Sequence, residues 1–332
     1  MVAMALTDMP LRELIDYRPD LPEPDDFDEF WRGTIAEHAP TDASVRLERF
    51  DSWLRALDVY DVTFAGYDGA AIKGWLHVPA GTSGPLPTVV QYHGYSGGRG
   101  FPFMMNHFAQ AGFAQLVMDT RGQSYRVPTP GKATADAHPD ALLPHTPGYM
   151  TMGIDDPGTH YYRRAYIDAL QAIRAARTLD LVDPARIVLQ GGSQGGAFTI
   201  AGAALAAMDG IDLVAAMPNV PFMCAIPRAL DVATTGPYPE VVAHLANWRH
   251  TAETAYRTLS YFDNLFLARR TTAGAQFSVG LLDTTCPPST VYATYNNWPG
   301  EKEIIAYSHN GHEGGGPYQI QAEIDLLHEI FG

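Results

Sequence analysis

The sequence predicts an α/β fold in which a mostly parallel central sheet is flanked by helices. Short apolar runs alternate with helical patterns from residue 88 to the end of the chain. Strands that are apolar along their whole length are typical of a sheet buried on both faces, and the alternation is typical of parallel strands joined by helices. The 332 residues, 46% of them hydrophobic, suffice for a sizeable core, and we expect a single domain over residues 1–332.

Two elements precede this alternation. Residues 1–45 predict a helical N-terminal extension, in which prolines at positions 22 and 24 precede a helix around residues 26–38. Residues 56–79 contain two alternating runs separated by Gly66-Tyr67-Asp68-Gly69. Because alternation on both sides of an Asp-Gly turn indicates paired strands, we expect an antiparallel hairpin there.

The later runs supply the sheet and its helices. The clearest helix covers residues 160–179, where Tyr162, Tyr166 and Ala169 begin an apolar stripe at three- and four-residue steps. Further helices are expected after residue 197, up to 208, and over roughly 317–331. The predicted strands are 88–92, 114–119, 186–190, 213–218, 277–283 and 303–308.

Two segments fit no strand–helix unit. Residues 124–159 are rich in proline and glycine, and a loop of that length in a compact domain is usually functional or makes contacts. Residues 219–265 lie between two predicted strands and have helical character. We expect this second segment to be a helical insertion that caps a site.

The charge balance excludes one class of partner. Lysine and arginine number 22 and aspartate and glutamate 37, which gives a net charge of −15. Nucleic-acid binding needs a basic footprint, so we expect no nucleic-acid partner. The charge suits a protein that acts on a neutral small molecule.

Cysteine content and the N-terminus bear on location. The two cysteines, Cys224 and Cys286, provide neither a disulfide framework nor a metal cluster. The first 31 residues are interrupted by charges and prolines and lack the apolar core of a signal peptide. No stretch reaches the length of a membrane span. We therefore expect a cytoplasmic protein with no membrane partner.

One serine lies among four glycines directly after a predicted strand. Residues 191–195, Gly-Gly-Ser-Gln-Gly, match the pattern G-x-S-x-G, which presents a nucleophilic serine on a sharp turn between a strand and a helix. The strand at 186–190 and the helix after 197 supply that context for Ser193. The alternative is a glycine-rich connection with a bystander serine, because such a short pattern also arises by chance.

A serine hydroxyl needs a base, and the base needs an orienting acid. In the α/β-hydrolase arrangement these follow in the order serine, acid, histidine. Asp283 ends a late strand, and His312 follows the last strand in a glycine-rich loop, so both lie where the geometry requires them. The weaker alternatives are His309, which has fewer glycine neighbours, and Asp119, which precedes the serine in the chain.

Ester cleavage also needs two N–H donors for the oxyanion. One is the N–H after the nucleophile, which belongs to Gln194, and the other should come from the loop after an early strand. His93-Gly94-Tyr95-Ser96-Gly97 follows the strand at 88–92, and we assign the Tyr95 N–H. The alternative is an ordinary glycine-rich loop, in which His93 only packs.

Together these motifs resemble a known family. R-G-Q at 121–123, G-x-S-Q-G at 191–195 and H-E at 312–313 are similar to signatures of carbohydrate esterase family 7, the acetyl xylan esterases and cephalosporin C deacetylases of the α/β-hydrolase fold. Segments such as HGYSG, YYRRAYIDAL and HEGGG also look like those of the family. The resemblance covers nearly the whole chain and presents three motifs in the right order.

The resemblance implies roles for individual residues. It implies Ser193 as nucleophile, His312 as base and Asp283 as orienting acid, with the Tyr95 and Gln194 amides as oxyanion hole. It also implies an intracellular homohexamer with the 124–159 loop at subunit contacts, and small acetylated substrates such as xylo-oligosaccharides and cephalosporin C. The two-step acyl transfer that it implies needs no metal or cofactor.

Other residues are expected to support the site or to pack around it. Arg121 and Gln123 need not touch substrate, and we expect Arg121 to pair with Glu313 and support the histidine loop. Cys286 is expected to be a small buried filler. Members of the insertion either line an acyl pocket or belong to the core; these are Phe222, Met223 and Pro227.

Two other functions are possible for this pattern. A serine peptidase such as an acyl-peptide hydrolase shares the fold but usually carries a propeller domain, and the chain shows no propeller repeats. A catalytically inactive binding protein of the same fold is the second, because fold alone implies no function. A complete set of catalytic residues argues against this second reading.

Overall fold

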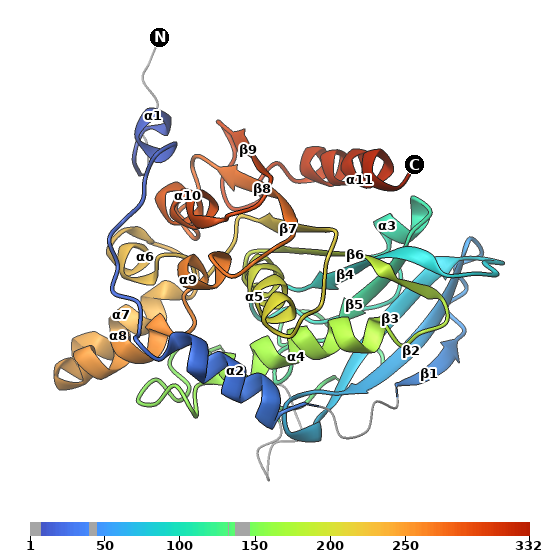
Figure 1. The fold of residues 1–332 in the computed structure, drawn as a ribbon, viewed down its shortest axis with the longest axis horizontal. Coiled ribbons are helices and arrows are strands. Elements are labelled where there is room, and N and C mark those ends of the chain that lie inside the picture. The colour runs from blue at the N-terminus through green and yellow to red at the C-terminus, as the bar shows by residue number, and fades with distance from the viewer. Residues whose placement is uncertain (1–7, 40–44, 132, 137–146) are drawn as a thin grey trace.

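The computed structural model describes residues 8–39, 45–131, 133–136 and 147–332. In these ranges nine strands form one sheet, in the order β1-β2-β3-β5-β4-β6-β7-β8-β9 (Figure 1). Pairing is antiparallel from β1 to β5 and parallel from β5 to β9. The strands are β1 (Arg46–Phe50), β2 (Leu57–Ala65), β3 (Ala71–Pro79), β4 (Leu86–Tyr92), β5 (Ala114–Met118), β6 (Val182–Gly192), β7 (Ala215–Asn219), β8 (Gly274–Gly280) and β9 (Lys302–Tyr307).

The predicted α/β architecture is confirmed. The hairpin is present as β2 and β3, which pair from Leu57↔Pro79 to Ala65↔Ala71, and Asp68 in its turn has a φ of 54°. Each of the six apolar runs lies on one of the strands β4 to β9. Strand β1 was not predicted, because its sequence RLERF is mostly exposed at the edge of the sheet and lacks an apolar run.

Helices cover both faces of the sheet. Val90 and Leu189 point into the larger core cluster with α4 (Tyr161–Ala176) and α5 (Gln194–Met208). Their neighbours Val89 and Val188 point to the other face, into a cluster that includes Leu327 of α11 (Pro317–Phe331) and Phe108 of α3 (His107–Gln110). This alternation buries the central strands completely, as the apolar runs predict.

The N-terminal segment crosses the molecule before the sheet begins. It contains α1 (Leu11–Leu14) and α2 (Phe27–Glu37). The Trp31 indole of α2 stacks on Tyr166 of α4 at 5.9 Å between ring centroids and donates a hydrogen bond to the Tyr261 carbonyl. These contacts attach the segment to the core and to the helices that follow β7.

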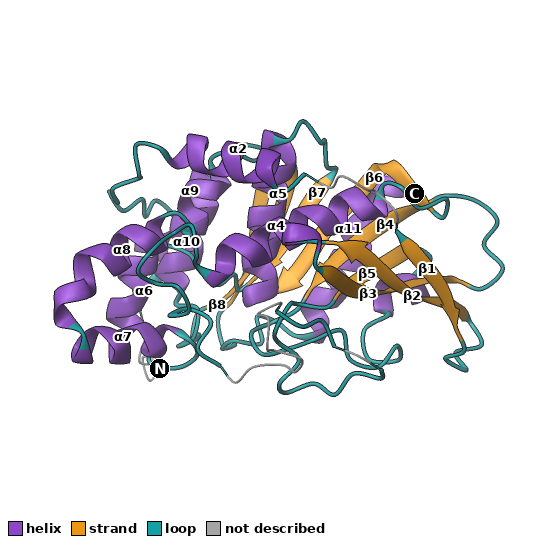
Figure 2. Cartoon of the chain, turned by 90° about the horizontal axis from the view of Figure 1, so that it is seen from below, coloured by secondary structure: helices purple, strands orange, loops and turns teal. Residues whose placement is uncertain are grey.

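The helices between β7 and β8 lie at one end of the molecule (Figures 1 and 2). They are α6 (Ile226–Val232), α7 (Tyr238–Asn247), α8 (Ala252–Ser260) and α9 (Asn264–Ala268), and α10 (Pro288–Asn297) follows β8. Short 3-10 turns occur at Tyr67–Gly69 and Arg249–Thr251. Within the described ranges, no helix has both the length and the apolar character needed to cross a membrane.

Candidate active site

Ser193 stands on a tight turn between β6 and α5. Its φ and ψ are 59° and −119°, a region that is costly for a residue with a side chain. The turn requires glycine beside it, because a Cβ at Gly195 would lie 2.3 Å from the Tyr92 carbonyl oxygen. Two backbone hydrogen bonds hold the turn: the Ser193 N–H donates to the Asn219 carbonyl at 2.9 Å, and the Phe222 N–H donates to the Ser193 carbonyl at 3.0 Å.

Three side chains from separate elements meet at this turn. His312, in the loop between β9 and α11, has Nε2 2.9 Å from Ser193 Oγ and Nδ1 2.8 Å from Asp283 Oδ2. Asp283 follows β8, and its side chain is fully buried. Its second oxygen accepts the N–H groups of Thr285 at 2.7 Å and Cys286 at 3.0 Å. The carboxylate is therefore held in place, and it orients the imidazole toward the serine.

Two N–H groups next to the serine have no partner of their own. In the described part of the chain, neither the Tyr95 N–H nor the Gln194 N–H makes a hydrogen bond. Gln194 begins α5, so its N–H is one of those that a helix start leaves unpaired. Tyr95 follows Gly94, and a Cβ at Gly94 would lie only 3.9 Å from Ser193 Cβ. The loop after β4 therefore lies directly beside the serine.

Gln123 joins the two segments that carry these N–H groups. Its Nε2 donates to Gln194 Oε1 at 2.8 Å, and Gln194 Nε2 donates back to Gln123 Oε1 at 3.1 Å. The same Gln123 oxygen accepts the Ser96 N–H at 2.7 Å, and Tyr162 donates its hydroxyl to Gln194 at 2.9 Å. The buried Gln123 side chain thus fixes the start of α5 against the loop after β4.

The expected ion pair between Arg121 and Glu313 is wrong. Arg121 is buried and donates two hydrogen bonds to Asp168 of α4, with Asp136 at 3.2 Å on its other side. Glu313 is exposed and bonds within its own loop, to the Gly311 N–H and to the Asn310 amide. Opposite charges in two motifs did not bring the two side chains together. A buried guanidinium needs a buried carboxylate as its partner, and Asp168 supplies one, whereas Glu313 is exposed. Each residue therefore braces a different part of the structure.

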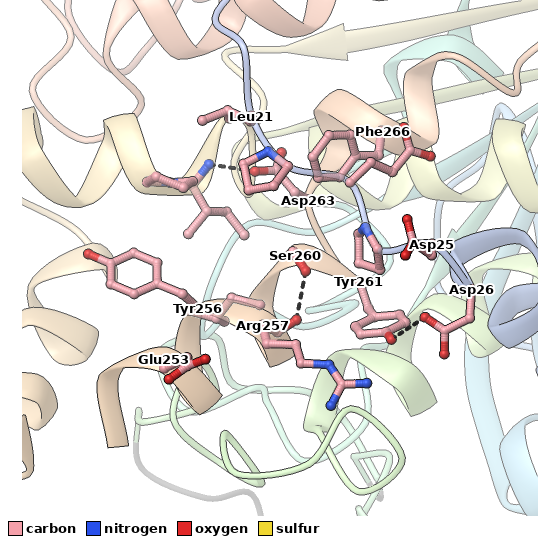
Figure 3. A pocket seen from close by; sticks show the side chains of 16 residues that line it. Leu21, Asp25, Asp26, Glu253, Tyr256, Arg257, Ser260, Tyr261, Asp263 and Phe266 are labelled. Carbon is pink, nitrogen blue, oxygen red and sulfur yellow. Dashed lines mark hydrogen bonds between the residues drawn. The ribbon is translucent and has the colours of Figure 1, made fainter. Parts of the chain in front are cut away.

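Ser193 and His312 open into a cavity of about 880 Å³. Phe222 and Met223 do not line it, because both are fully buried in the main core cluster. Pro227 lines a different cavity of about 680 Å³, between the N-terminal segment and α8 (Figure 3). Phe222 and Met223 therefore belong to the core and not to an acyl pocket. Pro227 belongs neither to that core cluster nor to the cavity at Ser193.

Several residues around the site carried no signal in the sequence. Glu240 of α7 accepts the Tyr95 hydroxyl at 2.7 Å, and that hydroxyl also accepts the Gly148 and Tyr149 N–H groups. Burial raises the pKa of Glu240, which lines the cavity. The contact joins the helical insertion to the loop after β4. It could not be found from spacing, because the partners are 145 residues apart.

Cys286 lies close to Asp283 and His312. One potential ligand atom from each of Asp283, Cys286 and His312 falls within 4.8 Å of the others. Burial and the charge of Asp283 raise the pKa of the Cys286 thiol, which keeps it protonated and makes it a poor metal ligand. Asp283 and His312 already bond one another, so this donor set does not fit a metal site.

In the loop after β4, burial lowers the pKa of His93 to about 4, so its ring is neutral.

The family model for acetyl xylan esterase (AXE1) matches residues 4–330. The chain belongs to the acetyl xylan esterase family. This family places it among the carboxylic ester hydrolases of the α/β-hydrolase fold.

Solved structures and a curated relative agree with this assignment. An acetyl xylan esterase from Paenibacillus sp. R4 is 36% identical, with a TM-score of 0.86 over 97% of this chain and 99% of the other. Acetyl xylan esterase 1 from Thermoanaerobacterium sp. JW/SL YS485 is 30% identical, with a TM-score of 0.84 over 98% and 100%. Acetyl esterase Axe7A of Xylanibacter ruminicola is 28% identical over 302 residues, which are 89% of this chain and 65% of that protein. The chain therefore spans about two thirds of this curated relative.

Proposed function

We propose that this protein hydrolyses acetyl esters of small molecules, such as acetylated xylo-oligosaccharides and cephalosporin C. The observation that carries the proposal is the chain of contacts from Ser193 Oγ through His312 to the buried Asp283, with 2.9 and 2.8 Å between the paired atoms. It lies in a cavity beside two unpaired N–H groups. Membership of the acetyl xylan esterase family supports the acetyl group as the acyl part.

The first step forms an acetyl-enzyme. Ser193 Oγ attacks the acetyl carbonyl carbon while His312 Nε2 takes the hydroxyl proton, and Asp283 stabilises the imidazolium. The tetrahedral oxyanion is met by the N–H groups of Tyr95 and Gln194, which need no reorganisation because no described residue competes for them. The bond from the carbonyl carbon to the alcohol oxygen then breaks. The alcohol leaves with the proton that His312 held.

The second step releases acetate. A water molecule takes the place of the alcohol, gives a proton to His312 and attacks the acetyl carbonyl carbon. The bond to Ser193 Oγ breaks, and the serine recovers its proton from the imidazole. The same oxyanion donors serve both steps, so a change to either N–H position slows acylation and deacylation together.

Gln123, Arg121 and Glu313 act as supports in this proposal. Gln123 holds the Gln194 side chain and the Ser96 N–H, and so keeps the two oxyanion donors at a fixed separation. Arg121 anchors the same loop to α4 through Asp168. Glu313 caps the loop that carries the base.

The family resemblance further leads us to propose a homohexamer in the cytoplasm. The 124–159 segment is proposed to contact neighbouring subunits, and part of it lies outside the described residues. Light scattering at micromolar concentration is expected to give six times the mass of one chain. A monomer would contradict this part of the proposal alone.

A peptidase activity has less support. The acylaminoacyl peptidase of Pyrococcus horikoshii shares the fold, with a TM-score of 0.58, but is only 17% identical, and the match covers 42% of that protein. A binding protein without activity would not need a buried acid aligned with a histidine and a serine.

The test compares substrates that differ in one part at a time. The purified protein is given acetylated xylo-oligosaccharide, cephalosporin C, p-nitrophenyl esters with two to eight acyl carbons, and an N-acetylated peptide p-nitroanilide. We expect release of acetate from the first two and a preference for the acetyl over the octanoyl ester. Hydrolysis of the peptide substrate without any acetyl ester hydrolysis would favour the peptidase instead.

A further inference from the structure

The cavity extends well beyond the catalytic groups. A volume of about 880 Å³ is in the range of sites for drug-sized ligands, whereas an acetyl group has two carbons. Most of this space therefore serves the alcohol part of the ester. Its lining there includes polar side chains near the ends of three strands, which are Gln91, Gln190 and Asn219, and the apolar side chains of Met104, Met105 and Ile320. His107, Arg126 and Gln319 also line it.

Asn219 is held in one orientation in the wall of this part of the cavity. Its Nδ2 donates to Glu323 Oε1 at 2.6 Å, which determines the orientation of the amide. Glu323 is itself buried and accepts Gln190 Nε2 on both oxygens at 3.2 Å. With Nδ2 turned to Glu323, the buried Oδ1 of Asn219 has no partner within the described residues.

His107 presents a second unpaired atom. It is the first residue of α3, and its buried Nε2 has no partner among the described residues. Burial lowers the pKa of His107 to about 4, so the ring is uncharged at neutral pH. Among the described residues that line the cavity, only Asn219 and His107 have a buried side-chain atom without a hydrogen bond.

A buried polar atom without a partner is costly, and its place on a residue that lines a ligand cavity suits a partner that the ligand supplies. An acetyl group has no donor to offer to Asn219 Oδ1, whereas a hydroxyl group both donates and accepts. Both atoms belong to uncharged groups, which suits a neutral ligand. The apolar side chains of Met104, Met105 and Ile320 lie in the same cavity and suit the C–H faces of a ring.

We propose that Asn219 and His107 form a subsite for the hydroxyl groups of a neutral, sugar-like alcohol part, and that they determine the preference for hydroxylated esters. The subsite rests on the proposed function, because it is defined relative to the acetyl group at Ser193. It assigns specificity to side chains that take no part in bond cleavage.

The test uses two esters of similar size. Methyl 3-O-acetyl-β-D-xylopyranoside offers free hydroxyls at carbons 2 and 4, and its 2,4-dideoxy-2,4-difluoro analogue offers no donor there. We expect kcat/KM of the wild type to favour the hydroxylated ester by about tenfold or more, since each neutral hydrogen bond contributes up to about a factor of ten. His107→Ala is expected to reduce this ratio severalfold, up to about tenfold, while hydrolysis of p-nitrophenyl acetate changes little, and Asn219→Ala is expected to reduce the ratio by a similar factor.

His244→Ala is the matched control. His244 also has a buried Nε2 without a partner among the described residues, but it belongs to α7 and does not line the cavity, so the ratio should stay at the wild-type value. If Asn219→Ala does not fold, His107→Ala decides the question, because it leaves the Ser193 turn untouched.

The outcomes separate this inference from the proposed function. An unchanged ratio in His107→Ala overturns the subsite, as does an equal loss on both sugar esters. A wild type that hydrolyses p-nitrophenyl acetate without preferring the hydroxylated ester also overturns it and leaves the proposed function in place. A wild type that hydrolyses no acetyl ester at all removes the proposed function, and the subsite with it.

Discussion

An Asp283→Asn substitution exchanges one hydrogen-bonding group in the site at constant volume. Asp283 Oδ2 lies 2.8 Å from His312 Nδ1, and Oδ1 accepts the N–H groups of Thr285 and Cys286. Because those N–H groups need an acceptor, the asparagine oxygen should take the Oδ1 position and leave its NH2 group facing His312. Nδ1 must then accept, the imidazole proton moves to Nε2, and the ring cannot take the Ser193 proton.

The expected loss is large and specific to the chemical step. A reversed histidine tautomer lowers kcat by about 10⁴, which corresponds to about 5.4 kcal/mol of transition-state stabilisation. The free energy of unfolding should change far less, because the backbone donors keep their acceptor. The assay is p-nitrophenyl acetate hydrolysis between pH 7 and 9, with urea unfolding of the same samples.

Asp325→Asn provides the matched control. Asp325 is an exposed carboxylate of α11 that accepts a hydrogen bond from the Gln321 amide. Its substitution should leave kcat within about twofold of the wild type, as surface changes away from the site usually do. If Asp283→Asn folds normally and loses less than about tenfold in kcat, Asp283 does not orient the base, and the reasoning fails.

Three further predictions concern the supports of the site. Gln123→Leu breaks the reciprocal amide pair and should lower kcat for p-nitrophenyl acetate by about 10- to 100-fold at an unchanged KM, since misplaced oxyanion donors act mainly in the transition state; a change confined to KM would count against this role. Arg121→Ala leaves Asp168 buried without its cation and should lower the free energy of unfolding in urea by about 3–5 kcal/mol. Removal of the half-exposed Arg186 from its surface ion pair should change it by less than about 1 kcal/mol, and equal effects would contradict the distinction. Burial raises the pKa of Glu323 from 4.5 to about 7, so the folded state holds that proton more tightly and stability should fall as pH rises between these values. Relative to Glu323→Gln, the wild type should lose about 3 kcal/mol between pH 4.5 and 7 in urea unfolding, and parallel pH profiles would show that Glu323 has an ordinary pKa.

The elements that the sequence predicted share a local cause. The buried strands β4 to β8 are apolar on both faces, so each is recognisable as an apolar run without any knowledge of its neighbours. The G-x-S-x-G pattern locates the turn at Ser193, because a Cβ at Gly191 would lie 2.5 Å from the Gly195 carbonyl oxygen, four residues away. The chain order serine, acid, histidine then indicated Asp283 and His312, and the structure brings both to the serine.

The features that escaped prediction depend on long-range register. Arg121 meets Asp168, 47 residues away, because the fold brings the segment after β5 against α4. Glu313 and Asp168 carry the same charge, so charge alone could not show which of the two carboxylates pairs with Arg121. Phe222 was similarly ambiguous, because an aromatic side chain suits a core and a pocket equally.

Polar atoms of the cavity were also beyond reach from the sequence. Asn219 ends a strand and His107 begins a four-residue helix, and neither belongs to a motif. Each has a buried side-chain atom without a hydrogen-bond partner in the described structure. For Asn219 this depends on the orientation that Glu323 gives to its amide.

The most direct test of the account is covalent labelling of Ser193. The wild type and Ser193→Ala are treated with a p-nitrophenyl phosphonate ester, and the released p-nitrophenol and the labelled peptide are quantified. We expect one equivalent released per chain, a label on Ser193, no release from Ser193→Ala, and at least about 10³-fold slower turnover of p-nitrophenyl acetate by that variant. Labelling or turnover by Ser193→Ala at the wild-type level would contradict the assignment of Ser193 as the nucleophile.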